Sequence, residues 1–131
     1  MTFLQQVMTV AAIAYLFVVA LLVGSFINLA ADRLPRGESV VRPRSHCRSC
    51  ERQLNLVDLI PVGGWLIRRG RCASCGAAIG AASPVVEALC GGAMLGALVL
   101  LGPALGAAVG AAGVALIGLS AVGFGYARVR A

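Results

Sequence analysis

The sequence predicts an α-helical integral membrane protein with about three transmembrane helices and one small polar domain between the first and the second. Hydrophobic residues make up 60% of the 131-residue chain, which is more than a typical soluble domain carries. Charged side chains occur only within residues 32–87 and at Arg128 and Arg130. The two uncharged stretches, residues 1–31 and 88–127, are long enough to cross a membrane. This separation of charged and uncharged stretches is the basis for predicting membrane helices.

Residues 1–31 form the first uncharged run, which we predict to be transmembrane helix 1. A signal peptide would have a basic start and a shorter apolar centre, whereas the basic residues of this chain follow the run. Because cytoplasmic loops are enriched in basic residues, the N-terminus is expected outside and the following loop in the cytoplasm. Gly24 and Asn28 lie four residues apart on one face and indicate helix packing rather than a substrate role.

The second and third helices are expected at residues 84–102 and 104–127, on either side of Gly102-Pro103. Ser83 suits a helix N-cap, Pro84 suits the first helical position, and Glu87 in the first turn would face the positive helix end. Small residues at GxxxG spacing predict close packing faces. These pairs are Gly92/Gly96, Gly102/Gly106 and Gly106/Gly110. The closing arginines, Arg128 and Arg130, would return to the cytoplasm, as the charge rule requires.

Residues 32–83 are expected to form a cytoplasmic domain built around two CxxC pairs. Two such pairs point four thiolates at one metal, and a four-sulfur tetrahedral shell is typical of structural zinc. The predicted zinc ligands are Cys47, Cys50, Cys72 and Cys75. A complete shell leaves no open position for water, so no catalytic residue is assigned. His46 is expected outside the shell, and Cys90 is expected to be a small buried side chain.

Between the two pairs, Pro61 and Gly63-Gly64 exclude one unbroken helix. Short strands or turns are expected there, with a helical turn near Trp65. The apolar side chains of residues 54–67 leave two interpretations open. They form the core of a domain too small to fold well without metal, or they rest on the membrane surface, with the arginines of residues 68–71 near lipid phosphates.

The chain carries a net charge of +6, which is also common in nucleic-acid-binding proteins. A cytoplasmic loop of a membrane protein accounts for the same charge, because nine of the eleven arginines lie between Asp32 and Glu87. We therefore expect membrane lipid as a partner and no nucleic acid.

The order of several motifs resembles the opening of the type IV prepilin peptidases. The matching segments are Gly24-Ser25-Phe26-Ile27-Asn28, Arg33-Leu34-Pro35-Arg36-Gly37-Glu38-Ser39-Val40-Val41, Pro43-Arg44-Ser45, Cys47-x-x-Cys50, Ile60-Pro61-Val62, Trp65-Leu66, Arg69-Gly70-Arg71-Cys72-x-x-Cys75 and Pro84-Val85-Val86-Glu87. Together they cover about residues 20–90. The chain departs from the family pattern at Leu59, where the family usually has Asn, and at Ser83, where it usually has an aromatic residue.

The resemblance implies a multi-pass enzyme of the bacterial inner membrane. Members of the family cleave the leader from type IV prepilins and pseudopilins, whose N-terminal helix is then a partner, and methylate the new N-terminus with S-adenosylmethionine. Their protease module uses two aspartates, one of them in a GxGD motif. This sequence contains only Asp32 and Asp58, neither of them in that context. The C-terminal aspartic protease module is therefore expected to be absent, and the chain is not expected to be proteolytic on its own.

Three functions follow from the resemblance. The first is an N-terminal module for prepilin leader cleavage and N-methylation, working with a separate aspartic protease chain or left from a truncated gene. The second is a non-catalytic, zinc-stabilised membrane scaffold or partner-binding module of a pilus or secretion assembly. The third is a stand-alone methyltransferase, which no glycine-rich nucleotide loop in the sequence supports. A neighbouring gene for the aspartate-bearing helices would favour the first, and its absence would favour the second.

Overall fold

The structure is a computed structural model and describes residues 2–131. Its elements are helix α1 (Phe3–Arg33), the short 3₁₀ helix η1 (Leu34–Arg36), and helices α2 (Gly63–Ile67), α3 (Ala82–Leu101) and α4 (Pro103–Arg130). Within the described range there is no strand, only two isolated antiparallel bridges in the loop region. The predicted helical turn near Trp65 is confirmed as α2.

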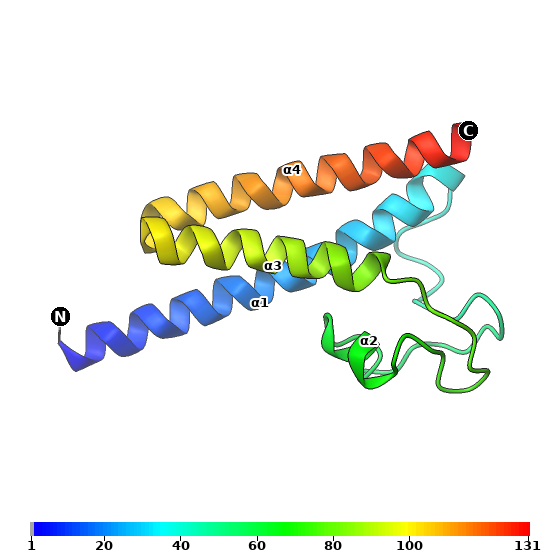
Figure 1. Ribbon diagram of the computed structural model, residues 1–131, viewed down its shortest axis with the longest axis horizontal. Coiled ribbons are helices and arrows are strands. Elements are labelled where there is room, and N and C mark those ends of the chain that lie inside the picture. Colours follow the sequence, from blue (N-terminus) through cyan, green and yellow to red (C-terminus); the bar gives the residue numbers. More distant parts are fainter. Residues whose placement is uncertain (1) are drawn as a thin grey trace.

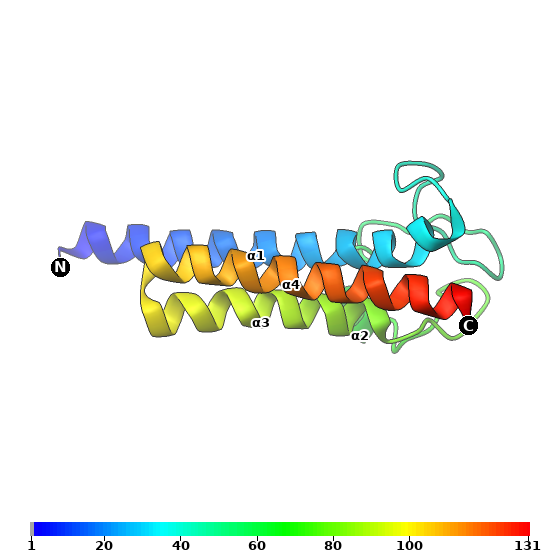
Figure 2. The same cartoon turned by 90° about the horizontal axis from the view of Figure 1, so that it is seen from above.

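The three long helices α1, α3 and α4 lie side by side and form the whole bundle (Figures 1 and 2). Helix α3 runs back along α1, and α4 returns in the direction of α1, so the two chain ends lie at opposite ends of the bundle (Figure 1). All three are long and apolar enough to cross a membrane. The predicted fold, three membrane helices with a cysteine domain between the first and the second, is therefore confirmed.

Small residues let the helices approach one another closely. A Cβ atom added at Gly24 of α1 would lie 2.8 Å from the Cα of Glu87, and one at Gly106 of α4 would lie 2.5 Å from the carbonyl oxygen of Ala97. Gly24 is thus a packing residue, as predicted. Cys90 is fully buried next to it. The buried core around it contains Ala20, Cys90, Met94, Leu98 and Val114.

The GxxxG predictions are correct only for Gly106/Gly110, which both pack against α3. A Cβ added at Gly92 or Gly96 would meet no atom within 4 Å, so the prediction of a packing face at this pair is wrong. The adjacent Gly91 is the glycine of α3 that faces α1. GxxxG spacing places two glycines on one face of a helix, but only the tertiary structure decides whether a neighbour lies on that face.

The start of α3 differs from the prediction. The helix begins at Ala82 without a side-chain cap, so Ser83 is not the N-cap and Pro84 is the third helical residue. Proline is tolerated there because the first four N–H groups of a helix have no partner within the helix. Glu87 lies beyond the first turn rather than in it, and the Ser83 hydroxyl donates a 2.8 Å hydrogen bond to its Oε1 atom.

Gly102 and Pro103 form the turn between α3 and α4, as the sequence indicated. Gly102 has a φ of 78° and a ψ of 172°, which glycine adopts without steric cost. Pro103 is the first residue of α4, where its missing N–H costs no hydrogen bond. The two membrane helices therefore pack antiparallel through a single-residue connection.

Candidate metal centre

The first CxxC pair forms a tight turn closed by the backbone. The N–H of Cys47 donates to the carbonyl oxygen of Arg52 at 2.9 Å, and the N–H of Glu51 donates to the carbonyl oxygen of Cys47 at 2.8 Å. Glu51 has a φ of 57°. This left-handed residue reverses the chain directly after the second cysteine, so both thiols of the pair point the same way.

The second CxxC pair repeats this geometry. The N–H of Cys72 donates to the carbonyl oxygen of Ala77 at 2.9 Å, and the N–H of Gly76 donates to the carbonyl oxygen of Cys72 at 3.0 Å. Gly76 takes the place of Glu51, with a φ of 69°. Each turn is also flanked by an isolated antiparallel bridge. The two turns are therefore two copies of one local structure.

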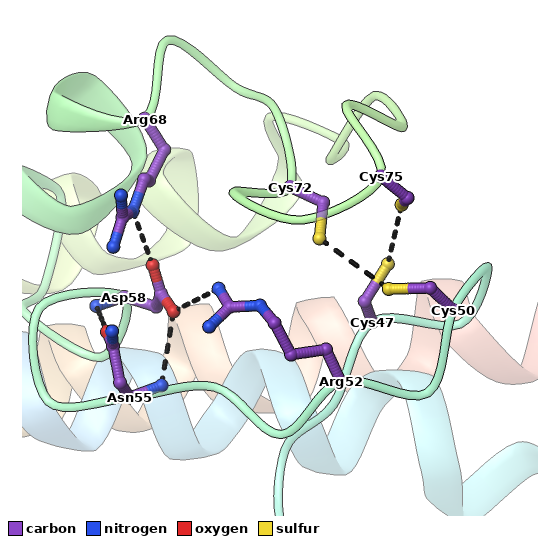
Figure 3. A network of polar contacts seen from close by, with 8 residues as sticks. All are labelled: Cys47, Cys50, Arg52, Asn55, Asp58, Arg68, Cys72 and Cys75. Carbon is purple, nitrogen blue, oxygen red and sulfur yellow. Dashed lines mark hydrogen bonds and ion pairs between the residues drawn. The ribbon is translucent and has the colours of Figure 1, made fainter.

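The two turns bring the predicted ligands together. Their four Sγ atoms lie within 4.8 Å of one another, and Figure 3 shows the two thiol pairs facing each other. The Sγ–Sγ distances are 3.8 Å for Cys47 and Cys75 and 3.9 Å for Cys50 and Cys72. A tetrahedral zinc shell with Zn–S bonds of about 2.3 Å requires sulfur separations of about 3.8 Å. A disulfide requires about 2.05 Å, so the thiols are free and fit a metal.

Backbone N–H groups of the last two residues of each turn point at the sulfur of the first cysteine. They lower the pKa of Cys47 and lower that of Cys72 to about 6, outweighing the opposing effect of burial. For Cys75, the N–H of Ala77 acts in the same direction, but burial and the neighbouring thiols raise the pKa to about 11. The peptide groups favour thiolates, and a cation would relieve the repulsion among the four sulfurs.

Beside the cysteines, Asp58 organises the loop between the two turns (Figure 3). Its carboxylate accepts hydrogen bonds from Arg52 at 2.6 Å, from Arg68 at 2.7 Å and from the N–H of Asn55 at 3.1 Å. The Asp58 side chain is only 6% exposed. Burial alone would raise its pKa, but the Asn55 N–H and the two guanidinium groups outweigh burial and lower it.

Arg52 connects this network to the cysteines. Figure 3 shows its side chain between Asp58 and the thiol cluster. The neighbouring carboxylate of Asp58 and the thiol of Cys72 both raise the pKa of Arg52. A guanidinium at this place offsets part of the negative charge that four thiolates would carry.

Asp32 forms a second, more exposed set of ion pairs. Its carboxylate contacts Arg48 and lies 2.9 Å from the guanidinium of Arg36, and its side chain is 43% exposed. Arg48 lies within the first CxxC turn, so the pair links that turn to the end of α1. Both aspartates of the sequence are thus held by arginines in the structure.

Three further contacts fix the domain on the bundle. Buried Arg33 donates to the carbonyl oxygens of Ser39 and Pro43, both at 2.9 Å. Buried Glu87 of α3 accepts a 2.6 Å hydrogen bond from the N–H of Val62, immediately before α2. The metal centre is therefore held at the end of the membrane helices where α1 ends and α3 begins.

Sequence reasoning assigned no structural role to Asp58 and misplaced Glu87. The spacing Asn55-x-x-Asp58 was the available signal for Asp58, since an Asx side chain often caps its own local turn. Here the Asn55 side chain accepts from the N–H of Asp58 at 3.0 Å, and the reciprocal bond closes the turn. His46 lies outside the sulfur cluster, with Nδ1 3.0 Å from the carbonyl oxygen of Arg44.

Known proteins resemble this chain. It is 46% identical over 77 residues to the prepilin leader peptidase/N-methyltransferase of Myxococcus xanthus. The aligned stretch covers 59% of this chain and 23% of that protein. It is 39% identical over 75 residues to the protein of the same name from Bacillus subtilis, covering 57% of this chain and 30% of the relative. A third protein of that name, from Burkholderia pseudomallei, is 34% identical over an alignment of 137 positions. This alignment covers 84% of this chain and 44% of the relative.

The chain thus spans less than half the length of these curated relatives. No solved structure matches it. The family described as Bacterial Peptidase A24 N-terminal domain matches residues 18–101, which include the four cysteines of the cluster and the whole of α3. Together with the three apolar helices, this match supports a multi-pass protein of the bacterial inner membrane. The chain belongs to the family of bacterial peptidase A24 N-terminal domains, the prepilin peptidases.

Proposed function

We propose that these residues form the zinc-bearing, membrane-embedded N-terminal module of a prepilin-processing system. The observation that carries the proposal is the four-thiol cluster, with Sγ–Sγ distances of 3.8 and 3.9 Å, inside the segment that matches the family. Zinc is the metal proposed, because four thiolates in a tetrahedral set select it over harder ions. When bound, zinc would be structural and would hold the two CxxC turns together.

We further propose that leader cleavage needs carboxylates from outside these residues. Aspartic proteolysis uses two carboxylates that share a proton, and neither is then tied up in a strong ion pair. Asp58 is buried between two arginines and Asp32 is paired with two others. The required carboxylates would come from further sequence or from a separate aspartic protease chain.

The proposed substrate is the N-terminal helix of a type IV prepilin or pseudopilin, and the proposed methyl donor is S-adenosylmethionine. Both proposals rest on the names of the relatives, which combine leader peptidase and N-methyltransferase. The membrane helices of this module would hold its cysteine domain at the cytoplasmic face, next to the place where a prepilin helix would lie in the membrane.

A reconstituted assay tests the function. Membranes carrying only this chain, and membranes carrying it with an aspartic protease chain of the family, are given a prepilin and labelled S-adenosylmethionine. We expect no cleavage by this chain alone and cleavage with the added chain. Cleavage by this chain alone would contradict the argument from the two paired aspartates. No cleavage or methylation in either membrane, with zinc bound, would favour the non-catalytic scaffold.

The proposed orientation places the N-terminus outside and both the zinc domain and Ala131 in the cytoplasm. It follows from the distribution of arginines, since the basic residues lie at one end of the bundle. A reporter fused after Ala131 checks it. Activity of a periplasm-specific reporter at that end would overturn the orientation.

A further inference from the structure

The segment around α2 exposes large apolar side chains instead of burying them. The exposed fractions are 82% for Leu56, 48% for Ile60, 60% for Leu66 and 61% for Ile67. These four side chains therefore do not form a core of the cysteine domain. Exposed apolar side chains gathered in one short segment mark a surface that binds a membrane or another protein.

The depth of this segment follows from its contact with α3. Helix α3 has 20 residues and is about 30 Å long, so it needs its whole length to cross the hydrocarbon core. Glu87 lies five residues into α3, about 7.5 Å from its start. Its carboxylate accepts the 2.6 Å hydrogen bond from Val62, which holds the start of α2 at that level. Figure 1 shows α2 beside the bundle where α3 begins.

Basic residues follow the apolar ones directly. Arg69 and Arg71 are exposed, whereas Arg68 is paired with Asp58. A short apolar segment at the level of the first turns of a membrane helix, followed by exposed guanidinium groups that no carboxylate of residues 2–131 pairs, has the pattern of an interfacial anchor. The apolar part fits the boundary between headgroups and acyl chains, and the arginines fit lipid phosphates.

We propose that residues 56–71 insert into the cytoplasmic membrane interface, with Leu56, Ile60, Leu66 and Ile67 among the acyl chains and Arg69 and Arg71 on the phosphates. The occupant of this surface is lipid. The anchor would fix the tilt of the zinc domain against the membrane and does not depend on the activity proposed above.

Trp65 of α2 is the single tryptophan of the chain and reports on this position directly. The full chain is reconstituted with lipids brominated near the headgroup end or near the terminal end of the acyl chain. We expect stronger quenching of Trp65 fluorescence by the shallow bromines than by the deep ones, and weak quenching by aqueous acrylamide. Strong quenching by acrylamide without quenching by bromines would overturn the proposal, because the segment would then lie in water.

Two variants separate insertion from folding. Replacing Leu66→Ser and Ile67→Ser together should reduce quenching by the shallow bromines and increase quenching by acrylamide, while the metal content stays unchanged. Val41→Ser is the matched control, since Val41 is 75% exposed but lies outside the segment. It should change neither signal. An unchanged signal in the double variant, or a Trp65 shielded from both quenchers by protein, would rule out lipid as the occupant.

Discussion

At the scale of single residues, the two aspartates show how burial decides what a charge contributes. Asp58 is 6% exposed and holds two arginines, whereas Asp32 is 43% exposed and also holds two. A carboxylate shielded from water interacts more strongly with its partners, and its removal leaves the partly buried guanidinium groups of Arg52 and Arg68 without a counter-charge. An exposed pair contributes little because solvent already screens both charges.

We expect Asp58→Asn to destabilise the cysteine domain by about 2 kcal/mol and Asp32→Asn by less than about 1 kcal/mol. The lowered pKa of Asp58 sets the pH dependence. Its contribution is fully present above its ordinary value of 3.8 and is lost as the pH falls through the lowered folded value. The loss of stability in both variants is measured by chemical denaturation at neutral pH, with the protease sensitivity of the cysteine domain as the signal for its unfolding. Equal losses in the two would contradict this account.

The left-handed residues after each CxxC pair offer a second test. Gly76 has a φ of 69° and open space where a Cβ atom would stand, so Gly76→Ala is expected to cost about 1 kcal/mol through backbone strain alone. Glu51 occupies the same position of the first turn with a φ of 57°, so Glu51→Gly should be neutral or stabilising. Competition with a metal chelator measures the metal affinity of both variants. A Gly76→Ala variant that holds metal as tightly as the parent would show that the turn does not need this conformation.

At the scale of elements, glycine determines how closely α4 approaches α3. We expect Gly106→Ala to destabilise this hairpin by about 1–3 kcal/mol, because the new Cβ would lie 2.5 Å from the Ala97 carbonyl oxygen and 2.6 Å from the Leu98 Cα. Both neighbours are backbone atoms and cannot move aside. Unfolding of the protein in bilayers or mild detergent measures the loss.

Gly92→Ala is the control for this helix pair. It should leave stability unchanged, since no atom lies within 4 Å of the added Cβ. A loss comparable to that of Gly106→Ala would mean that another protein chain packs against Gly92. The comparison therefore separates packing within the chain from packing outside it.

At the scale of the whole molecule, the bundle and the cysteine domain depend on different forces. The bundle buries Ala20, Cys90, Met94, Leu98 and Val114, while most of the large aliphatic residues of the domain stay exposed. A domain without an apolar core needs other contacts for its stability. Here these are the ion pairs of Asp58 and, on our proposal, the metal.

Metal removal should therefore unfold one part and spare the other. We expect a zinc chelator, or Cys47→Ser, to make residues 38–80 sensitive to protease while the helical circular dichroism of the membrane spans persists. The parent protein should contain one zinc per chain. Metal content far below this, unchanged by Cys47→Ser, would contradict the proposed site, and Cys90→Ser serves as the control because Cys90 lies apart from the cluster.

The sequence by itself determined the three membrane helices, the break at Gly102-Pro103 and the grouping of Cys47, Cys50, Cys72 and Cys75. Long uncharged runs and CxxC spacing depend on local composition, and local composition is directly readable. Only the tertiary structure decided that Gly91 and not Gly92 faces α1, that Asp58 holds two arginines and that Glu87 holds Val62. The polar contacts join residues that are 6, 10 and 25 positions apart, and the contact of Gly91 depends on a helix rotation of one position. The free energy that selects them comes from how the chain folds back on itself, which local composition does not contain.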